Sequence, residues 1–193
     1  MKIAVIKYNA GNIRSVFYAL ERLGIEATVT DDKNFIRSAD KVIFPGVGEA
    51  SSTMKYLREN GLDELIFNLK QPVLGICLGQ QLMCKESEEG NTACINIFDA
   101  PVVKFQPLLK VPHMGWNKLY NTKGELFKGL EKDSYVYFVH SFYTPICNYT
   151  IASCDYITEF SAAMQRENFF STQFHPEKSG SVGQMILKNF IEL

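Results

Sequence analysis

The sequence predicts an α/β fold of three layers, in which helices cover both faces of a mostly parallel sheet and antiparallel strands extend it. Two observations carry this prediction. In the first half of the chain, short apolar runs alternate with helical stripes, which is the pattern of a parallel sheet covered on both sides. In the second half, strand-like runs follow one another with few helices between them. The 193 residues show no linker, repeat or low-complexity segment, so we expect one domain over 1–193.

The elements of the first half follow from hydrophobic spacing and from the glycines at their ends. The segment 13–23 carries apolar residues at helical intervals, and Gly24 follows as a stop signal. Gly61 ends a second helical pattern in the same way. Short apolar runs predict the strands between these helices. The predicted strands are 2–6, 25–29, 41–44 and 72–74, and the predicted helices are 13–23, 50–59, a segment that begins at 62, and 78–85.

The second half contains mainly strand-like segments, and we expect them to form the antiparallel extension. They are 102–105, 135–139, 151–154, 161–164 and 169–174, followed by a closing helical stripe at 182–190. In open α/β sheets the functional site lies at the carboxyl ends of the strands. The loop at 45–48, Cys77 and His175 all fall at such ends.

Composition excludes several classes of protein. Hydrophobic residues make up 46% of the chain, which argues against disorder, and a net charge of −1 gives no reason to expect a nucleic acid or an anionic membrane as partner. The segment 1–6 is too short for the apolar region of a signal peptide, and no apolar run approaches the length of a membrane span. Five cysteines without a C-x-x-C pair favour a reduced, cytoplasmic setting and give zinc little support. A G-x-G-x-x-G dinucleotide fingerprint is also absent from the first βα unit.

A cysteine flanked by glycines is the strongest candidate for a catalytic residue. Cys77 lies in the run Gly75-Ile76-Cys77-Leu78-Gly79, after a predicted strand and before a predicted helix. This pattern is typical of a nucleophile at a sharp turn, where the glycines allow tight folding and the thiol stands exposed. The alternative is a buried structural cysteine. We interpret the other four cysteines as structural, namely Cys84, Cys94, Cys147 and Cys154.

The best candidate for a catalytic base is His175, which follows a predicted strand and is followed by Pro176 and Glu177. Side chains at i and i+2 of an extended chain point to one side, so we expect Glu177 beside His175. A thiol nucleophile needs a base, and the base needs an orienting acceptor. With Cys77, these residues form a candidate Cys-His-Glu triad for hydrolysis or acyl transfer. The alternative for His175 and Glu177 is a surface ion pair.

The two other histidines are weaker candidates. His140 lies in a strand-like run, where it is either a hydrogen-bonded structural histidine or a residue near the substrate. His113 lies in a predicted loop at 111–116 with no carboxylate nearby in the sequence. Trp116 is in the same loop, and it is either a core anchor or an interface residue, because tryptophan is enriched at interfaces.

Two backbone N–H groups are expected to form an oxyanion hole. Acyl chemistry uses the N–H of the residue after the nucleophile, here Leu78, and one from a neighbouring glycine-rich loop. The run Pro45-Gly46-Val47-Gly48 is such a loop, and its glycines would let the peptide at Val47 turn its N–H inward. Taken alone, this run is equally consistent with an ordinary strand-to-helix turn.

These runs together resemble the class I glutamine amidotransferase family. The matching runs are Phe44-Pro45-Gly46-Val47-Gly48, Gly75-Ile76-Cys77-Leu78-Gly79-Gln80-Gln81 and His175-Pro176-Glu177. Two further runs are similar to the glutaminase subunits of imidazole glycerol phosphate synthases within that family. They are Val111-Pro112-His113-Met114-Gly115-Trp116-Asn117 and His175-Pro176-Glu177-Lys178-Ser179. The resemblance covers essentially the whole chain.

The resemblance implies hydrolysis of glutamine to glutamate and ammonia. Cys77 would form the glutamyl thioester, His175 would carry the protons, and Glu177 would orient His175. Val47 and Leu78 would donate the oxyanion N–H groups. Residues expected to contact glutamine are Gly46, Gly48, Gln81, Ser141 and Phe142.

The resemblance also implies a partner, and it implies neither a cofactor nor a metal. Ammonia would pass to a separate (β/α)8-barrel cyclase subunit in a heterodimer, which makes imidazole glycerol phosphate and aminoimidazole carboxamide ribotide in histidine biosynthesis. Residues expected at the interface are Asn12, Trp116, Tyr137 and Lys178. The first loop departs from the family's frequent aspartate-tyrosine-glycine, because the run 7–10 is Lys-Tyr-Asn-Ala before Gly-Asn. We therefore expect the triad to be retained and the partner-facing surface to differ.

Three alternative functions remain open from the sequence. The first is a glutaminase that serves a different synthase. The second is a free-standing cysteine peptidase or γ-glutamyl hydrolase on the same fold, and the third is a non-catalytic regulatory module. A free-standing hydrolase would work alone, whereas a synthase subunit would need its partner. Retention of Cys77, His175 and Glu177 together argues against the regulatory module.

Overall fold

The computed structural model describes residues 1–9 and 13–193. Its first half confirms the alternation of strands and helices. The elements are β1 Ile3–Ile6, α1 Ile13–Arg22, β2 Thr28–Thr30, α2 Lys33–Ser38, β3 Lys41–Gly46, α3 Ala50–Glu59, α4 Leu62–Phe67, β4 Val73–Cys77 and α5 Leu78–Met83. Helix α2 is the one element of this half that the hydrophobic spacing did not predict, because its six residues bury only Ile36.

The second half is rich in strands, as the sequence predicts, and ends in a long helix. The elements are β5 Cys84–Ser87, β6 Thr92–Ala93, β7 Phe98–Lys104, β8 His113–Lys118, η1 Glu125–Phe127, β9 Tyr135–His140, β10 Phe142–Tyr143, β11 Thr150–Tyr156, β12 Thr158–Arg166, β13 Phe169–Thr172, η2 Pro176–Lys178 and α6 Gly180–Glu192. Here η marks a short 3₁₀ helix.

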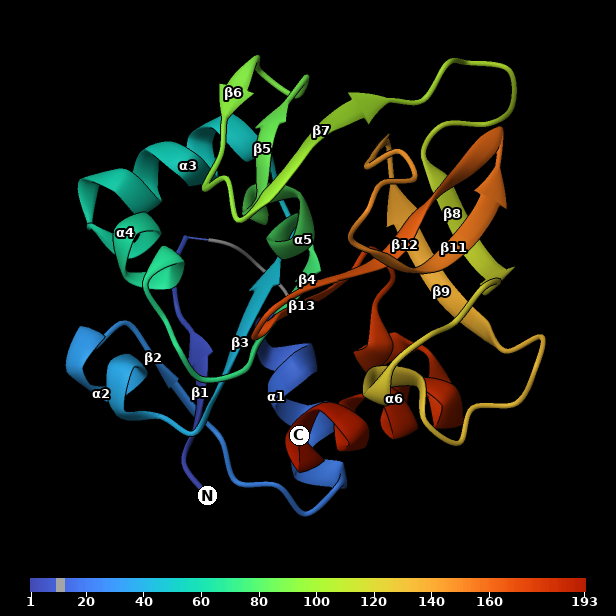
Figure 1. The fold of residues 1–193 in the computed structure, drawn as a ribbon. Helices are drawn as coiled ribbons and strands as arrows, with labels where there is room; N and C mark the ends of the chain where they lie inside the picture. Colours follow the sequence, from blue (N-terminus) through green and yellow to red (C-terminus); the bar gives the residue numbers. More distant parts are fainter. Residues whose placement is uncertain (10–12) are drawn as a thin grey trace.

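A seven-stranded sheet forms the centre of the molecule, in the order β11-β12-β13-β4-β3-β1-β2 (Figure 1). The five strands from β13 to β2 are parallel, and β12 and β11 continue the sheet antiparallel. This arrangement confirms the mostly parallel sheet and its antiparallel extension. Because β3, β4 and β13 are neighbours, the segments that follow their carboxyl ends meet at one edge of the sheet.

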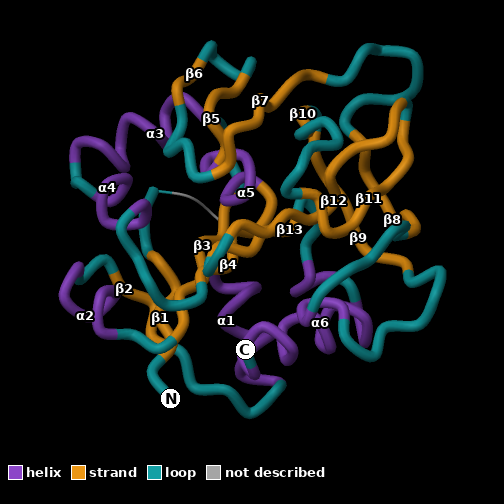
Figure 2. Tube along the Cα trace, in the orientation of Figure 1, coloured by secondary structure: helices purple, strands orange, loops and turns teal. Residues whose placement is uncertain are grey.

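Helices cover both faces of this sheet, because successive strand residues point to opposite sides. In β1, Ile3 and Val5 pack with α1 and α6 in one buried cluster, whereas Ala4 and Ile6 pack with α2 to α5 in another. Figure 2 shows the purple helices on either side of the orange strands. The structure therefore has the three predicted layers.

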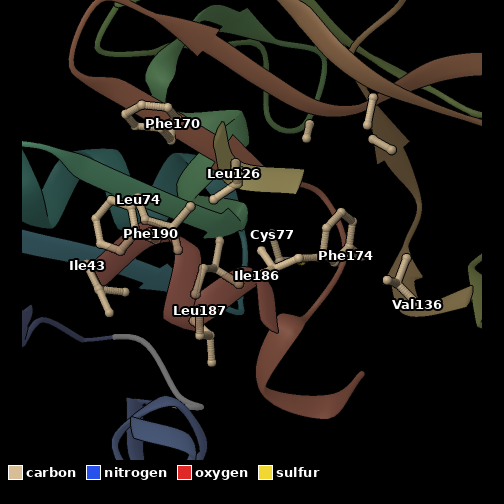
Figure 3. Close-up of a cluster of buried hydrophobic side chains, with 14 of the residues drawn as sticks. Ile43, Leu74, Cys77, Leu126, Val136, Phe170, Phe174, Ile186, Leu187 and Phe190 are labelled. Atoms are coloured by element: carbon tan, nitrogen blue, oxygen red, sulfur yellow. The ribbon is translucent and has the colours of Figure 1, made fainter. Parts of the chain in front are cut away.

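The cluster beneath the sheet reaches the candidate nucleophile. Cys77 shares this cluster with Phe174, which lies just before η2, and with Ile186, which lies in α6 (Figure 3). Ile186 and Phe174 are fully buried, and burial of such side chains stabilises the fold by about 1.5–3 kcal/mol each. The backbone around Cys77 thus rests on a packed apolar layer.

Three details of the sequence prediction were wrong. Residues 113–116 of the predicted loop 111–116 form a strand, since they lie in β8, which pairs antiparallel with β9 in a separate two-stranded ribbon. The strands predicted at 102–105 and 135–139 lie in smaller sheets, outside the extension of the main sheet. The helix predicted at 78–85 ends at Met83, because Cys84 is extended and pairs with Phe98 of β7.

Among the described residues, no helix combines the length and the apolar character that crossing a membrane requires.

Candidate active site

Cys77 lies at the junction of β4 and α5, in a strained backbone conformation. Its φ is 55° and its ψ is −108°, a combination that a residue with a Cβ rarely adopts. Strain of this kind persists where the surrounding structure fixes it, and it is concentrated at functional sites. The turn is therefore the sharp strand-to-helix elbow that the sequence predicts.

The glycines around Cys77 allow close packing of the elbow. A Cβ on Gly79 would lie 2.1 Å from the carbonyl oxygen of Phe44, so only glycine lets α5 approach β3 this closely. The positive φ belongs to Cys77 itself. One expectation needs correction, because Cys77 is only 7% exposed and does not stand free on the surface. It lines a cavity that is partly open to solvent instead.

This cavity has a volume of about 360 Å³ and brings together most of the predicted site residues. Its predicted members are Val47, Gly48, Cys77, Leu78, Gln81, Ser141 and Phe142. Gly46 is not among the lining residues; it pairs with Cys77 in the register between β3 and β4. A cavity of about 460 Å³ elsewhere, at 119–122 and 131–134, contains neither a cysteine nor a histidine.

His175 and Glu177 are in direct contact, as the sequence predicts. The Nδ1 atom of His175 lies 2.7 Å from Oε1 of Glu177, and both side chains are buried. The reason for the contact differs from the prediction, since 176–178 forms a 3₁₀ turn and no extended strand. Pro176 begins that turn, where the fixed φ of proline suits a helical start. The burial excludes the alternative of a surface ion pair.

The charge state of His175 depends on its two neighbours. Burial lowers its pKa, but a hydrogen bond and charge interaction with Cys77, together with the Glu177 carboxylate, outweigh burial and raise the pKa to about 10. These interactions also place His175 beside Cys77. The three predicted triad residues therefore form one contiguous buried group, with the imidazole between a thiol and a carboxylate.

Further polar contacts surround the thiol. The Nε2 atom of Gln173 lies 3.7 Å from Sγ of Cys77, and the Oε1 atom of Gln173 accepts a hydrogen bond from Gln81 at 2.9 Å. Gln81 also donates to the carbonyl oxygen of Phe142 at 2.9 Å. The sequence pattern did not identify Gln173, because nothing in the run 169–174 distinguishes it from an ordinary strand residue.

Four residues that line the cavity were not predicted as site residues, namely Glu89, Pro112, Val139 and His140. His140, for which the sequence left a position near the substrate open, is among these lining residues. Glu89 accepts a hydrogen bond from the N–H of Ala50 at 2.8 Å, and burial raises the pKa of its carboxyl group. No local pattern marked Glu89, because it lies in the turn between β5 and β6, and only the packing of this hairpin places it at the cavity.

Tyr8 supports the loop that follows β3. Its hydroxyl donates to the carbonyl oxygen of Pro45, and its ring packs on Phe44 with centroids 5.5 Å apart. Burial, and to a smaller extent Cys77, raises the pKa of Tyr8. Tyr8, which lies within the run 7–10 that departs from the family pattern, thus contacts the loop from which an oxyanion donor is expected.

Three of the four residues expected at a partner interface lie close together in the structure. Trp116 is 56% exposed, and its ring centroid lies 6.2 Å from that of Tyr137 on the paired strand β9. The Nζ atom of Lys178 lies 6.0 Å from the centre of the Tyr137 ring. Asn12 lies outside the described residues. We call Trp116, Tyr137 and Lys178 the aromatic-lysine surface.

The remaining cysteines are placed away from the cavity lining, and no disulfide is formed among the five. Burial raises the pKa of the thiols of Cys84, Cys94 and Cys154 to about 12 in each case, which makes them poor nucleophiles. In the part of the chain that the structure describes, no group of three or more His, Cys, Asp and Glu side chains is arranged to hold a metal ion.

Comparison with known proteins gives matches along the whole chain. The family model "Glutamine amidotransferase class-I" matches residues 4–193. Imidazole glycerol phosphate synthase subunit HisH of Bacteroides thetaiotaomicron is 61% identical over 100% of both chains, and that of Bacteroides fragilis is 62% identical with the same coverage. The HisH subunit of Colwellia psychrerythraea is 44% identical over 100% of this chain and 93% of its own length.

Solved structures show the same fold at lower sequence identity. A glutamine amidotransferase has a TM-score of 0.76 and 19% identity, covering 98% of this chain and 97% of that chain. A chain of PurLQS from Thermotoga maritima has a TM-score of 0.74 and 17% identity, covering 99% and 97%. The chain is thus a member of the class I glutamine amidotransferase family and, within it, of the HisH subunits of imidazole glycerol phosphate synthase.

Proposed function

We propose that this chain hydrolyses glutamine to glutamate and ammonia, with Cys77 as nucleophile, His175 as proton carrier and Glu177 as the carboxylate that orients His175. One observation carries the proposal. The strained elbow presents the Cys77 thiol to a cavity, and a buried imidazole that is hydrogen-bonded to a carboxylate at 2.7 Å adjoins the thiol. A thiol, a base and an orienting acceptor are the parts that acyl transfer needs.

The raised pKa of His175 determines how the reaction starts. With a pKa of about 10, the imidazole of His175 carries a proton at neutral pH. The attacking form of a cysteine nucleophile is the thiolate. The thiolate attacks the side-chain carbonyl carbon of glutamine. The imidazolium then gives its proton to the leaving ammonia, and the glutamyl thioester remains. Water, deprotonated by His175, then attacks the thioester carbonyl carbon. Glutamate is released, and the Cys77 sulfur leaves as a thiolate beside the protonated imidazole.

The negative oxygen of each tetrahedral intermediate needs N–H donors. We propose the backbone N–H groups of Leu78, directly after the nucleophile, and of Val47. Both residues line the cavity with Cys77. A donor of this kind contributes about 3 kcal/mol to stabilisation of the transition state. The register that pairs Gly46 with Cys77 keeps the Val47 loop next to the thiol.

Glutamine would be held by the polar groups of the same cavity. Gln81, the segment 141–142 and Gly48 supply amide and backbone groups around it. Glu89 is the one carboxylate among the lining residues, so it suits the α-ammonium group of the substrate.

We propose further that the ammonia passes to a (β/α)8-barrel cyclase subunit of the HisF type in a heterodimer. The full-length relatives at 61% and 62% identity support this proposal, because they are named as subunits of imidazole glycerol phosphate synthase. The products would be imidazole glycerol phosphate and aminoimidazole carboxamide ribotide. The aromatic-lysine surface is the proposed docking site.

Replacement of the nucleophile tests the glutaminase. Cys77→Ala in the complex with the cyclase subunit should lower glutamine hydrolysis by several orders of magnitude, as loss of a triad nucleophile does. Synthesis from added ammonia should persist, since that chemistry takes place in the partner. The matched control is Cys94→Ala, a half-buried cysteine outside the cavity lining, which should retain hydrolysis. Normal hydrolysis by Cys77→Ala would refute the assignment.

A further inference from the structure

Two histidines that the proposed mechanism does not use form a buried pair next to the cavity. His113 and His140 are cross-strand partners in the β8–β9 ribbon, and they are 4% and 6% exposed. The Nδ1 atom of His113 lies 3.0 Å from Nε2 of His140. Buried polar groups of this kind need complete hydrogen bonding, so the direction of each bond in the pair can be derived.

The outer end of the pair fixes one direction. Asn117 accepts the N–H of Lys118 on Oδ1 at 2.8 Å, and its Nδ2 donates to the carbonyl oxygen of Asp155 at 3.0 Å. The amide nitrogen of Asn117 therefore faces Nε2 of His113, at 3.3 Å. Because that nitrogen can only donate, Nε2 of His113 is the acceptor and the ring proton of His113 resides on Nδ1.

The inner end requires the same arrangement independently. Nδ1 of His140 lies 2.8 Å from the carbonyl oxygen of Phe142, which can only accept. His140 therefore carries its proton on Nδ1, and its Nε2 accepts from Nδ1 of His113. Both ends agree on two neutral imidazoles with the proton on Nδ1. A second proton on Nε2 of His140 would face the Nδ1–H of His113. A second proton on Nε2 of His113 would face the amide N–H of Asn117.

The chain of bonds ends at the proposed glutamine site. The carbonyl oxygen of Phe142 takes a hydrogen bond from His140 and another, at 2.9 Å, from Gln81. Gln81 also bonds to Gln173, whose Nε2 lies 3.7 Å from the sulfur of Cys77. The ring of His113 is stacked between Phe138 and Tyr156, with centroids 4.8 Å and 4.0 Å away, so it cannot rotate without losing both contacts.

We propose that His113 and His140 are positioning residues for glutamine, which hold the Phe142 carbonyl and thereby fix the 141–142 segment and the Gln81 amide at the cavity. We call Asn117, His113, His140 and the Phe142 carbonyl the imidazole relay. The proposal rests on the proposed glutaminase site. Burial supports it, since it lowers the pKa of His113 to about 4 and of His140 to about 3 and keeps both rings neutral.

Kinetics of conservative variants in the cyclase complex test the relay. His140→Phe keeps an aromatic ring but no donor, and it should raise KM for glutamine about tenfold with kcat changed less than about threefold. His140→Asn keeps a donor at the position of Nδ1 and should recover most of the affinity. His113→Phe acts one bond further away, so its KM should rise about threefold. The double Phe variant should be no worse than His140→Phe, because both changes break one relay.

A control and a spectroscopic measurement separate positioning from packing. Tyr156→Phe keeps the ring stacked on His113 but loses the hydrogen bond to the Lys110 carbonyl, and it should leave KM unchanged. In protein labelled with ¹⁵N-histidine, His113 and His140 should show the Nδ1–H tautomer at neutral pH. A wild-type KM in His140→Phe, a proton on Nε2 of His140, or KM changes that merely follow loss of Tm would overturn the proposal. Failure of the wild-type complex to hydrolyse glutamine would instead contradict the proposed function, while the tautomers would still decide the relay.

Discussion

The three histidines of this chain lie in one region but are driven to opposite charge states. Burial without an acidic partner lowers the pKa of His113 and His140. His175 is also buried, yet Cys77 and Glu177 raise its pKa to about 10. Partners therefore decide the outcome, because a nearby negative charge outweighs the cost of desolvating an imidazolium.

We expect these differences to appear in titration and in stability. Between about pH 6.5 and 4, His113 and His140 bind protons in the unfolded chain but stay neutral in the folded chain. The free energy of unfolding should therefore decrease as the pH is lowered from 6.5. The raised pKa of His175 contributes stability that is fully present below about pH 6.5 and is lost as the pH rises through 10. NMR titration of the imidazoles, with denaturant unfolding at each pH, measures both. Titration of His175 near pH 6.5 would show that the Cys77–His175–Glu177 group is not coupled.

The carboxylate of Glu177 is expected to orient and charge His175 without acting as the base. Glu177→Gln keeps the shape but removes the negative charge, so turnover should fall strongly, though less than in Cys77→Ala. The pKa of His175 should fall as well, because one of the groups that raise it is gone. Glutaminase assays of the complex and the His175 titration test both parts. A variant with normal turnover would leave Glu177 with a structural role only.

At the scale of elements, the sequence predicted the helices and strands whose bounds depend on local residue patterns. Helix α3 begins and ends where the pattern placed it, at Ala50 and Glu59, since apolar spacing and a following Gly61 define it. Strand β8 was not predicted because Gly115 and Asn117 are poor strand residues, and pairing with β9 overrides their preference. The end of α5 depends on Cys84 meeting β7, a contact between distant parts of the chain.

The same distinction explains what the sequence predicted of the site. The elbow and the His175–Glu177 pair are local in sequence, so residue spacing identified them. Gln173, Glu89 and the imidazole relay depend on register between strands and on loops that return to the cavity. A lone histidine at 113 or 140 has no sequence signal that reveals its cross-strand partner.

A glycine of α6 is expected to control the position of the His175–Glu177 turn. A Cβ on Gly183 would lie 1.9 Å from the carbonyl oxygen of Pro176, so the helix and the turn are in backbone contact there. Gly183→Ala should push η2 away, destabilise the protein by about 1–3 kcal/mol, and lower kcat more than KM. Gln184→Ala, on the exposed side of the same helix, is the matched control. Unfolding and glutaminase assays test this, and unchanged kcat with lost stability would limit Gly183 to packing.

At the scale of the whole molecule, the proposed docking site adjoins the proposed catalytic group. The N–H of His175 donates to the carbonyl oxygen of Tyr137 at 2.9 Å, and Ser179 donates its hydroxyl to the carbonyl oxygen of His175. Lys178 is one residue from Glu177 and lies over the Tyr137 ring. A partner that binds the aromatic-lysine surface would therefore contact the elements that hold the imidazole.

Removal of the exposed indole tests this surface. Trp116→Ala should weaken association with the cyclase subunit, by about 2 kcal/mol or more if Trp116 is a hot spot, and should leave the chain folded. Phe67→Ala is the control, because Phe67 is an exposed aromatic residue of α4, on the other side of the sheet. Calorimetric titration with the purified partner measures both. Equal affinities for the two variants would place the interface elsewhere.

The isolated chain is expected to be a poor glutaminase that its partner activates. Hydrolysis without an acceptor would waste glutamine, and the Val47 peptide lies between two glycines that allow it to flip. An N–H turned away from the thioester would cost one oxyanion donor, about 3 kcal/mol or about a hundredfold in kcat. Binding of the partner with its ligand would select the inward loop through a differential affinity of that size. Assays of the chain alone, with the cyclase, and with the cyclase and its ligand should show a stepwise rise in kcat. Full activity of the chain alone, unchanged by the partner, would favour a free-standing hydrolase, because only a loop that is already inward needs no selection.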